Sequence, residues 1–446
     1  MKKTTIALIL ISVVCVSLMI RVQFAKSSPK TIFVPDDYRT IHEAIGNATA
    51  GDTVFVKKGT YQEQTLEINK PLTLLGEDVN ETTINFNPPL VNVTFPNQTI
   101  MVHSTAISIR ASTVRLSSFT INLPDDNYAC IDGLSAIGDR IDIIGNILGR
   151  GCNLNLNGTL LSVAENSMRS GLQVYGYNQT IARNLIHGLI SQGTCNRIVE
   201  NIVNGSFSLR GYFNLVVGNS FSTMYLEDSD SNFISNNTFR CLWIGINRLG
   251  CSYNTICKNR VTGPDNWGIL MGTGSYNIFH DNLISNYTGG YGIAVGGNNL
   301  VAEHNVFYRN ILMNNGWHVS ANWEILGPGN YWDNGKEGNY WDDYTGIDSN
   351  NDGMGDAPYV VEGCKWDDAA GGIVGFVFGH DDYPLMSPFD IDSVSIELPE
   401  WASALLNLSI EPQAPEPFPI TRVVAIPASV VALSVGLIVY FKKRKR

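Results

Sequence analysis

One pattern recurs in NRIVEN (196–201), NLVVGN (214–219), NFISNN (232–237), NTICKN (254–259) and NIFHDN (277–282). Each segment begins with Asn, carries an apolar residue within three places and ends with a second Asn. NQTIARN (178–184) precedes the set and NLVAEHN (299–305) follows it, so the starts are 18, 18, 18, 22, 23 and 22 residues apart. A repeat of about 20 residues is typical of a solenoid.

The repeat has the period of a β-strand. Apolar and polar residues alternate within each segment, and Gly or Asn interrupts every run. A second apolar stretch in each repeat begins with Gly, as in Gly188-Leu189 and Gly268-Ile269. Three short strands then form one rung, and rungs stack about 4.8 Å apart. We therefore expect an all-β chain folded as a right-handed parallel β-helix.

The register of this solenoid can be predicted from the same segments. We expect the side-chain amides of Asn196, Asn214, Asn232, Asn254 and Asn277 to form a ladder along the stack. We expect Ile198, Val216, Ile234, Ile256 and Ile278 to be buried on top of one another. Cys130 and Cys152 are separated by about one rung, and we expect them to be neighbours, bonded or not.

The opening TIFVPDDYRTIHEAIGNATAGDTVFVKKGTYQEQTLEINKPLTLLGE (31–77) contains a short helical stripe of Ile41, Ala44, Ile45 and Ala48. Such a helix can cap the first rung and hide its strand edge. Together with the repeats and the GNYWDDY…DGMGD…DDYPL ending, this opening resembles the NosD-like parallel β-helix repeat family, which includes many archaeal surface proteins. The resemblance covers residue 31 to about 389 and implies the β-helix fold.

Both ends of the chain indicate a membrane. Lys2 and Lys3 precede an apolar run, as in a secretory signal, although an uncleaved N-terminal anchor is the alternative. Residues 423–441 are apolar and are followed by a basic tail, which favours a single membrane crossing with the body outside. The ending resembles the tripartite C-terminal signals of archaeal surface proteins.

These features divide the chain into six parts. We expect a signal peptide (1–28), an N-terminal cap with the first rungs (29–77), β-helix repeats (78–327), a C-terminal cap (328–390), a linker that is Pro-rich at its end (391–419) and a transmembrane anchor with a basic cytoplasmic tail (420–446). The formal net charge of −11 argues against nucleic acid as a partner. Ten Asn-x-Ser/Thr sequences permit glycosylation of a surface protein.

Catalytic patterns are scarce. A lyase or hydrolase on a β-helix needs converging carboxylates, or Arg or Lys beside them. The expected outward positions after each strand-opening Gly are Gln173, Ile190, Asn247, Leu270, Ala294 and His318, which include no acid and no Arg or Lys. Asp125, Asp126 and Asp132 in an irregular early stretch are the remaining acid candidates. The seven His residues are scattered, so the sequence gives little support for a copper site.

Three aromatic residues recur near the start of the Gly-led strand, namely Trp243, Trp267 and Tyr291. Aromatic faces can stack on sugar rings, so these residues are candidates for carbohydrate binding. The alternative is that they fill the core. GNYWDN (329–334) and GNYWDD (338–343) raise the same choice: Tyr331, Trp332, Tyr340 and Trp341 either plug the last rung, with Asp342 and Asp343 near the following loop, or form a carbohydrate platform.

The sharpest metal motif is DSNNDGMGD (348–356). Asp348, Asn350, Asp352 and Asp356 occupy places 1, 3, 5 and 9 of a calcium-type loop, and Gly353 permits its tight turn. No Glu stands at place 12, where the chain has Tyr359. We predict a calcium site here; the alternative is an Asx-rich turn without an ion.

The sequence therefore favours a non-catalytic cell-surface β-helix protein that binds glycans or surface-layer proteins. A polysaccharide lyase or glycoside hydrolase is the main alternative. Metal-site maturation of the NosD kind is a third, which would require a cluster of His, Met or Cys side chains.

Overall fold

The computed structural model describes residues 28–407 except 97, 127–128, 247–249, 297–301, 322–328 and 368–370. The predicted anchor and all but the last residue of the predicted signal peptide lie outside these residues. Among the residues described, no helix is long and apolar enough to cross a membrane. Residues 30–410 form one compact unit.

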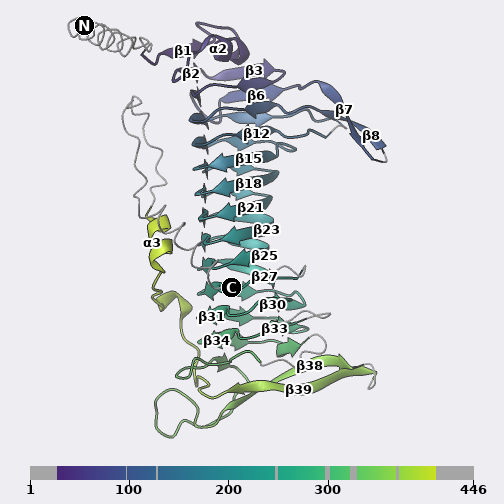
Figure 1. Cartoon of the computed structure of the whole chain (residues 1–446), viewed down its shortest axis with the longest axis vertical. Helices are drawn as coiled ribbons and strands as arrows, with labels where there is room; N and C mark the ends of the chain where they lie inside the picture. The colour runs from purple at the N-terminus through teal and green to yellow at the C-terminus, as the bar shows by residue number, and fades with distance from the viewer. Residues whose placement is uncertain are drawn as a thin grey trace, which may run out of the picture. The chain divides into compact units, whose positions relative to one another are not determined.

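The unit is a parallel β-solenoid, as predicted (Figure 1). One wall is a 13-stranded sheet in which each strand pairs with its equivalent in the next rung. In stacking order its strands are β1 (Thr31–Val34), β2 (Thr53–Val56), β5 (Leu72–Gly76), β10 (Val114–Ser117), β13 (Ile141–Ile144), β16 (Ser162–Ala164), β19 (Thr180–Ala182), β22 (Arg197–Val199), β24 (Leu215–Val217), β26 (Phe233–Ser235), β28 (Thr255–Cys257), β31 (Ile278–His280) and β34 (Val306–Tyr308).

The remaining walls belong to a 24-stranded sheet with two columns. The first column holds β3 (Gly59–Glu63), β6 (Thr82–Phe86), β11 (Thr120–Asn122), β14 (Ile147–Leu148), β17 (Ser167–Met168), β20 (Leu185–Ile186), β29 (Arg260–Thr262), β32 (Leu283–Ser285), β35 (Ile311–Met313) and β37 (Tyr340–Trp341). The second column holds β4 (Leu66–Ile68), β9 (Ile107–Ile109), β12 (Leu134–Ile137), β15 (Leu154–Thr159), β18 (Gly171–Tyr177), β21 (Gly188–Thr194), β30 (Trp267–Met271), β33 (Tyr291–Val295), β36 (Trp317–Ala321) and β38 (Tyr359–Asp367). The longer strands β23 (Ile202–Tyr212), β25 (Ser220–Asp230) and β27 (Thr238–Ile244) belong to both columns.

The predicted asparagine ladder is confirmed and is one of two. The backbone N–H of Asn196 donates to Oδ1 of Asn214, and the same contact passes down the stack as far as Asn330. The second ladder consists of Asn146, Asn166, Asn184, Asn201, Asn219, Asn237, Asn259, Asn282, Asn310 and Asn339. Buried amides therefore satisfy the corners of successive rungs.

Two details of the predicted register are wrong. Ile256 pairs with Phe279, whereas Ile278 pairs with Thr255 and is 39% exposed. The residue that enters the solenoid core is the second after the ladder Asn, and Ile278 is the first. In NLVAEHN the ladder residue is the final Asn305, so this rung takes 28 residues.

Both ends of the solenoid are covered. Helix α2 (Ile41–Asn47) buries Ile41, Ala44 and Ile45, as the helical stripe predicted, and the Thr40 hydroxyl accepts the N–H of Glu43 at its start. At the other end Trp332 and Trp341 are 2% and 1% exposed, which confirms that they plug the last rung. Tyr331 does not: it is 54% exposed.

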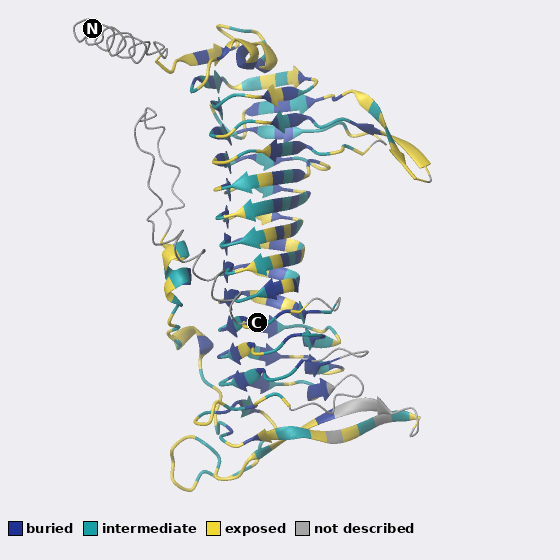
Figure 2. Cartoon of the chain, in the orientation of Figure 1, coloured by how far each residue is buried: buried dark blue, intermediate teal, exposed yellow. Residues whose placement is uncertain are grey.

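Three features lie outside the regular rungs. The hairpin of β7 (Leu90–Phe95) and β8 (Gln98–His103) projects from the early rungs and is largely exposed (Figure 2). β39 (Gly372–Asp381) pairs antiparallel with β38 and forms the C-terminal cap. The 3-10 helix η1 (Ile391–Ser393) and helix α3 (Glu400–Leu406) occupy part of the predicted linker, where Ala402 packs with Leu215, Phe233 and Cys257 of the 13-stranded sheet.

Free thiols are carried by Cys130, Cys152, Cys195, Cys241, Cys251 and Cys257. Burial raises the pKa of Cys152 to about 12, and the nearby Cys130 adds to this shift. A thiol with so high a pKa is a poor nucleophile. The effect of Cys130 on the pKa of Cys152 is compatible with the prediction that the two residues are neighbours, but no disulfide joins them.

Candidate binding cleft in the C-terminal cap

A cleft of about 590 Å³ opens between the last rungs and the C-terminal cap. Strand β36 supplies Trp317 and His318, the turn after β37 supplies Asp342 and Asp343, and β38 supplies Tyr359. Its described lining is Asn315, Gly316, Trp317, His318, Asp342, Asp343, Tyr344, Thr345, Gly346, Pro358, Tyr359, Val360 and Glu362. Residues distant in sequence meet here because the cap folds back on the solenoid.

His318 is held in one tautomer by Asn315. The Asn315 amide is oriented by the N–H of Tyr287, which donates to its Oδ1 at 3.2 Å, and by its own Nδ2, which donates to the Ile284 carbonyl at 3.1 Å. The same Nδ2 lies 3.3 Å from Nδ1 of His318, which must therefore accept. The ring proton is consequently on Nε2, and His318 is 7% exposed.

That proton points at two carboxylates. Nε2 of His318 lies 3.0 Å from Oδ1 of Asp342 and 3.4 Å from Oδ1 of Asp343. Asp342 also accepts the backbone N–H of Asn314, and Asp343 accepts the Tyr359 hydroxyl at 3.2 Å. Burial raises the pKa of Asp343, but the His318 contacts and the Tyr359 hydroxyl outweigh it and hold this pKa below its ordinary value. The cleft therefore presents ionised, acceptor-only groups.

An aromatic row leads into the cleft. Trp267 pairs with Tyr291, and Tyr291 pairs with Trp317, so the three rings stand on successive rungs. Trp317 is 39% exposed, whereas the other two are partly exposed. Trp267 and Tyr291, two of the three predicted carbohydrate-binding residues, therefore lie in one row with Trp317, which lines the cleft.

Trp243 lies on the preceding rung but is out of line with this row. It pairs with Leu270 and contacts Trp267 edge-on, with ring centroids 6.4 Å apart. Its indole Nε1 is buried without a hydrogen-bond partner. Trp243 therefore supports the Trp267 ring from the preceding rung.

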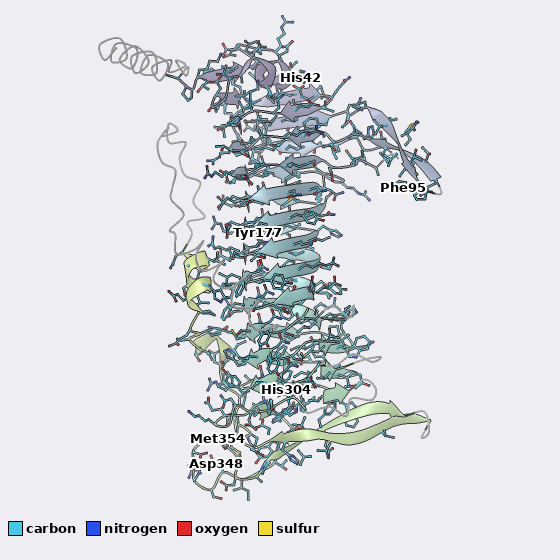
Figure 3. All side chains as sticks on the ribbon, viewed as in Figure 1. His42, Phe95, Tyr177, His304, Asp348 and Met354 are labelled. Carbon is cyan, nitrogen blue, oxygen red and sulfur yellow. The ribbon has the colours of Figure 1, made fainter. Side chains whose placement is uncertain are left out.

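The residues of the predicted calcium loop are not part of this cleft lining, and Figure 3 shows Asp348 and Met354 at the lower end of the view. Asp348 accepts the N–H groups of Asp352 and Gly353, and Asp352 accepts the N–H of Met354 at 2.9 Å. Asn350 accepts the N–H of Asp352, and Asp356 accepts that of Ser349. The four predicted ligands thus fold the loop as Asx turns, and Gly353 adopts φ 88°. Calcium binding stays a prediction.

The early acid candidates do not converge. Asp126 lies 2.8 Å from Nε2 of His103, whose Nδ1 contacts the Pro88 carbonyl at 2.6 Å. Burial lowers the pKa of His103, but the Asp126 and Pro88 contacts raise it more, so the pair favours an imidazolium. Asp132 has a pKa raised to about 6 by burial. It is half-buried near the backbone of the early rungs.

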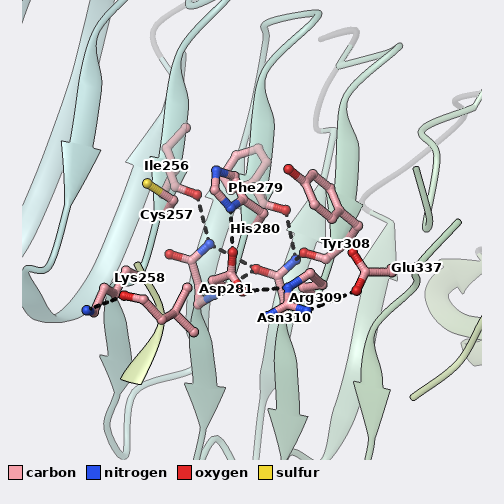
Figure 4. A network of polar contacts seen from close by, with 12 residues as sticks. Ile256, Cys257, Lys258, Phe279, His280, Asp281, Tyr308, Arg309, Asn310 and Glu337 are labelled. Atoms are coloured by element: carbon pink, nitrogen blue, oxygen red, sulfur yellow. Dashed lines mark hydrogen bonds and ion pairs between the residues drawn. The ribbon is translucent and has the colours of Figure 1, made fainter. Parts of the chain in front are cut away.

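A polar network on the outer side of the last rungs is fully paired (Figure 4). Asp281 accepts from His280 at 2.7 Å and from Arg309 at 2.8 Å, and Arg309 also reaches Glu337 at 3.0 Å. His280 stacks on Tyr308, whereas His304 stacks on Tyr276 in another column. These groups join rungs to the cap, and the two His residues share no ligand set.

The described residues do not fit a copper centre. The group of His, Cys, Asp and Glu ligand atoms that the described chain brings within 4.8 Å of one another is that of His318, Asp342 and Asp343. It has no sulfur donor. A metal-bound His donates its other ring N–H to an acceptor, whereas Asn315 presents an N–H to His318.

Sequence reasoning missed this cleft. It placed His318 at an outward position and Asp342 and Asp343 near the loop, without joining them. The available signal was the Asp pair directly after buried Trp341, where the last rung ends. Because the partners come from three non-repeating segments, no period connects them.

Residues 137–346 match the family model described as periplasmic copper-binding protein (NosD). The chain is thus a NosD-like parallel β-helix protein, as its motifs indicated. No curated protein matches the chain.

Several solved structures are similar. The A-module of the Azotobacter vinelandii mannuronan C-5 epimerase AlgE4 is 13% identical, with a TM-score of 0.47, covering 65% of this chain and 92% of that chain. A mannuronic-acid-specific family 6 polysaccharide lyase from human gut microbiota is 13% identical, with a TM-score of 0.47, covering 68% and 82%. The Dettilon tailspike protein is 13% identical, with a TM-score of 0.45, covering 64% and 68%. At such identities no residue role transfers.

Proposed function

We propose that this NosD-like β-helix protein is a cell-surface glycan-binding protein whose binding site is the cleft of Trp317, Asp342 and Asp343. One observation carries the proposal: an exposed indole and two carboxylate side chains line the same cleft. Sugars offer an apolar C–H face and a rim of hydroxyl donors. A ring that stacks on Trp317 could donate to the aspartates.

The aromatic row lengthens this site. Trp267, Tyr291 and Trp317 stand on successive rungs, about 4.8 Å apart at the backbone. An extended glycan could follow the row along the wall of the solenoid. The proposed ligand is therefore a chain of several sugars.

The geometry favours binding over hydrolysis. A glycoside hydrolase needs one carboxyl group that stays protonated as general acid. In the cleft the pKa of Asp343 lies below its ordinary value. Asp381 has a pKa raised to about 6, but its side chain is fully buried and bonds Trp341 beneath the cleft. Polysaccharide cleavage remains the alternative to test.

A glycan array probed with the full-length chain in detergent tests the proposal. We expect binding, and Trp317→Ala should weaken it by about 30-fold or more, as for a central aromatic anchor. Tyr177→Ala is the matched control, because Tyr177 is 61% exposed on β18 outside the cleft lining.

Three results would decide against the proposal. Unchanged binding in Trp317→Ala with a normal melting temperature would remove the cleft as the site. Release of shortened or unsaturated sugars from a bound glycan would make the protein an enzyme. Binding to isolated surface-layer proteins, with none to glycans, would favour the alternative partner.

A further inference from the structure

Acidic side chains dominate the cleft. Its described lining contains Asp342, Asp343 and Glu362 and no Lys or Arg. Asp342 and Asp343 line the same cleft as Trp317, so we expect a sugar seated on the indole to meet both. The nearest basic side chain in the lining is His318.

His318 adds one basic side chain to this lining. Its Nε2 lies 3.0 Å from Oδ1 of Asp342 and 3.4 Å from Oδ1 of Asp343. A single imidazole cannot balance the charge of three carboxylate side chains, so the acidic groups of the lining outweigh the basic one.

Asp342 and Asp343 act as hydrogen-bond acceptors. Asp342 accepts from His318 and Asn314, and Asp343 accepts from His318 and Tyr359. An ionised carboxylate has about four acceptor sites, so each keeps capacity for a ligand. Only ligand hydroxyl, amide or ammonium groups can use it. A ligand carboxylate would bring repulsion in a partly desolvated cleft.

We infer that the cleft selects glycans without carboxylate or sulfate groups, that is, neutral or amino polysaccharides, and rejects uronate-containing ones. The inference rests on the proposed glycan-binding function and names its ligand class.

The test uses one backbone in two charge states. Oligogalacturonate and its methyl ester differ in charge while keeping the same sugar rings. Neutral gluco-, manno- and galacto-oligosaccharides and chitosan oligosaccharides complete the panel. Full-length protein is assayed by calorimetry with a chelator present, so that no cation bridges acidic groups.

We expect the uncharged or amino members to bind and the methyl ester to exceed the free acid by about 100-fold or more, since two like charges face the acid. Salt should narrow that gap. The double variant Asp342→Asn, Asp343→Asn should weaken binding of the neutral ligand and reduce the discrimination between ester and acid to the part that Glu362 supplies. Trp317→Ala should weaken binding without changing the ratio.

The outcomes are distinguishable. Equal or tighter binding of oligogalacturonate by the parent chain overturns the charge selection but leaves glycan binding intact. Undiminished discrimination in a folded double variant also overturns it, because the selection would then arise elsewhere. Failure to bind any member, with failure on the wider array, removes the proposed function and this inference together.

Discussion

The stacked rungs and the C-terminal cap handle buried polar groups in opposite ways. In the rungs, Asn219 accepts from Asn201 through Oδ1 and donates to Asn237 through both its backbone N–H and Nδ2. In the cap, Asp381 accepts the backbone N–H of Asn339 at 2.6 Å, and the ladder ends at this carboxylate. An amide can continue a ladder because it is donor and acceptor, whereas an ionised carboxylate can only end one.

This difference also determines which part of the molecule can respond to pH and ligands. The ladder amides are uncharged and hydrogen-bonded to one another, so pH and cations do not act on them directly. The carboxylates of the cap are titratable and have acceptor capacity left over. Asp381, the cleft aspartates and the Asp348–Asp356 loop all lie after the last regular rung. We therefore expect the rungs to determine stability and the cap to respond to conditions and ligands.

Replacing an internal ladder amide by a carboxylate should have the largest effect. Asn219→Asp preserves shape but removes the Nδ2 donor to Asn237 and to the Ile198 carbonyl at 2.9 Å, at a site only 2% exposed. Leaving these acceptors unpaired beside a buried charge should cost roughly 3–5 kcal/mol of unfolding free energy. Urea unfolding followed by circular dichroism measures it.

Asn155→Asp is the control for this substitution. Asn155 lies between buried Leu154 and Leu156 on the partly exposed side of β15. Its carboxylate would meet water, so the expected change is within about 0.5 kcal/mol. An equal loss in both variants would mean that added charge, and not the broken ladder, destabilises the solenoid.

The reverse substitution at the end of the ladder should act through pH. Burial raises the pKa of Asp381 from 3.8 to about 6, although the N–H of Asn339, the indole of Trp341 and the N–H of Tyr383 oppose the rise. The folded state therefore holds its proton more tightly than the unfolded state. This group's contribution to stability is complete below pH 4 and is lost as pH rises to 6, by roughly 3 kcal/mol. Asp381→Asn should remove that loss.

Parent and variant must be compared across the same pH range. Asp132 also has a pKa raised to about 6 by burial and contributes a loss of the same sign. Asp132→Asn is thus the matched control, and it should leave unchanged the pH-dependent loss of unfolding free energy that Asp381 causes. Denaturant midpoints for Asp381→Asn that fall between pH 4 and 6 as steeply as those of the parent would contradict the assignment.

The regular fold was predictable because every rung repeats the same contacts. An Asn at a corner must meet the Asn of the next rung, so the spacing of Asn196, Asn214 and Asn232 predicts the ladder. The prediction failed at Ile278, where an apolar side chain was chosen by its type and not by its distance from Asn277. Position relative to the corner decides burial, because the turn fixes which residue points inward.

The cleft was not predictable by the same reasoning. His318, Asp342 and Glu362 belong to a rung, a turn and a hairpin that occur once. These residues come together because β38 and β39 fold across the last rung, and the sequence repeat contains no information about that arrangement. The tight turn of the calcium-type loop was predictable because its spacing is local, whereas calcium binding there stays a prediction. Local spacing and periodicity are visible in a sequence, whereas single long-range contacts are not.

The calcium-type loop should give the smallest effect of the three. Asp348, Asn350 and Asp352 already accept backbone N–H groups within the loop, so it can fold without an ion. If calcium binds, ligand linkage should raise the unfolding free energy by roughly 2.7 kcal/mol at a hundredfold excess over Kd. The full-length chain should then melt at a higher temperature in calcium than in chelator, and Asp352→Ala should abolish that difference.

Asp78→Ala is the control, because Asp78 accepts the N–H of Asn80 in a similar turn in the early rungs. This substitution should leave the calcium-dependent rise in melting temperature unchanged. Coincident melting curves for the parent in calcium and chelator would leave the loop as an Asx-rich turn, and the cap would then respond to pH and ligands alone.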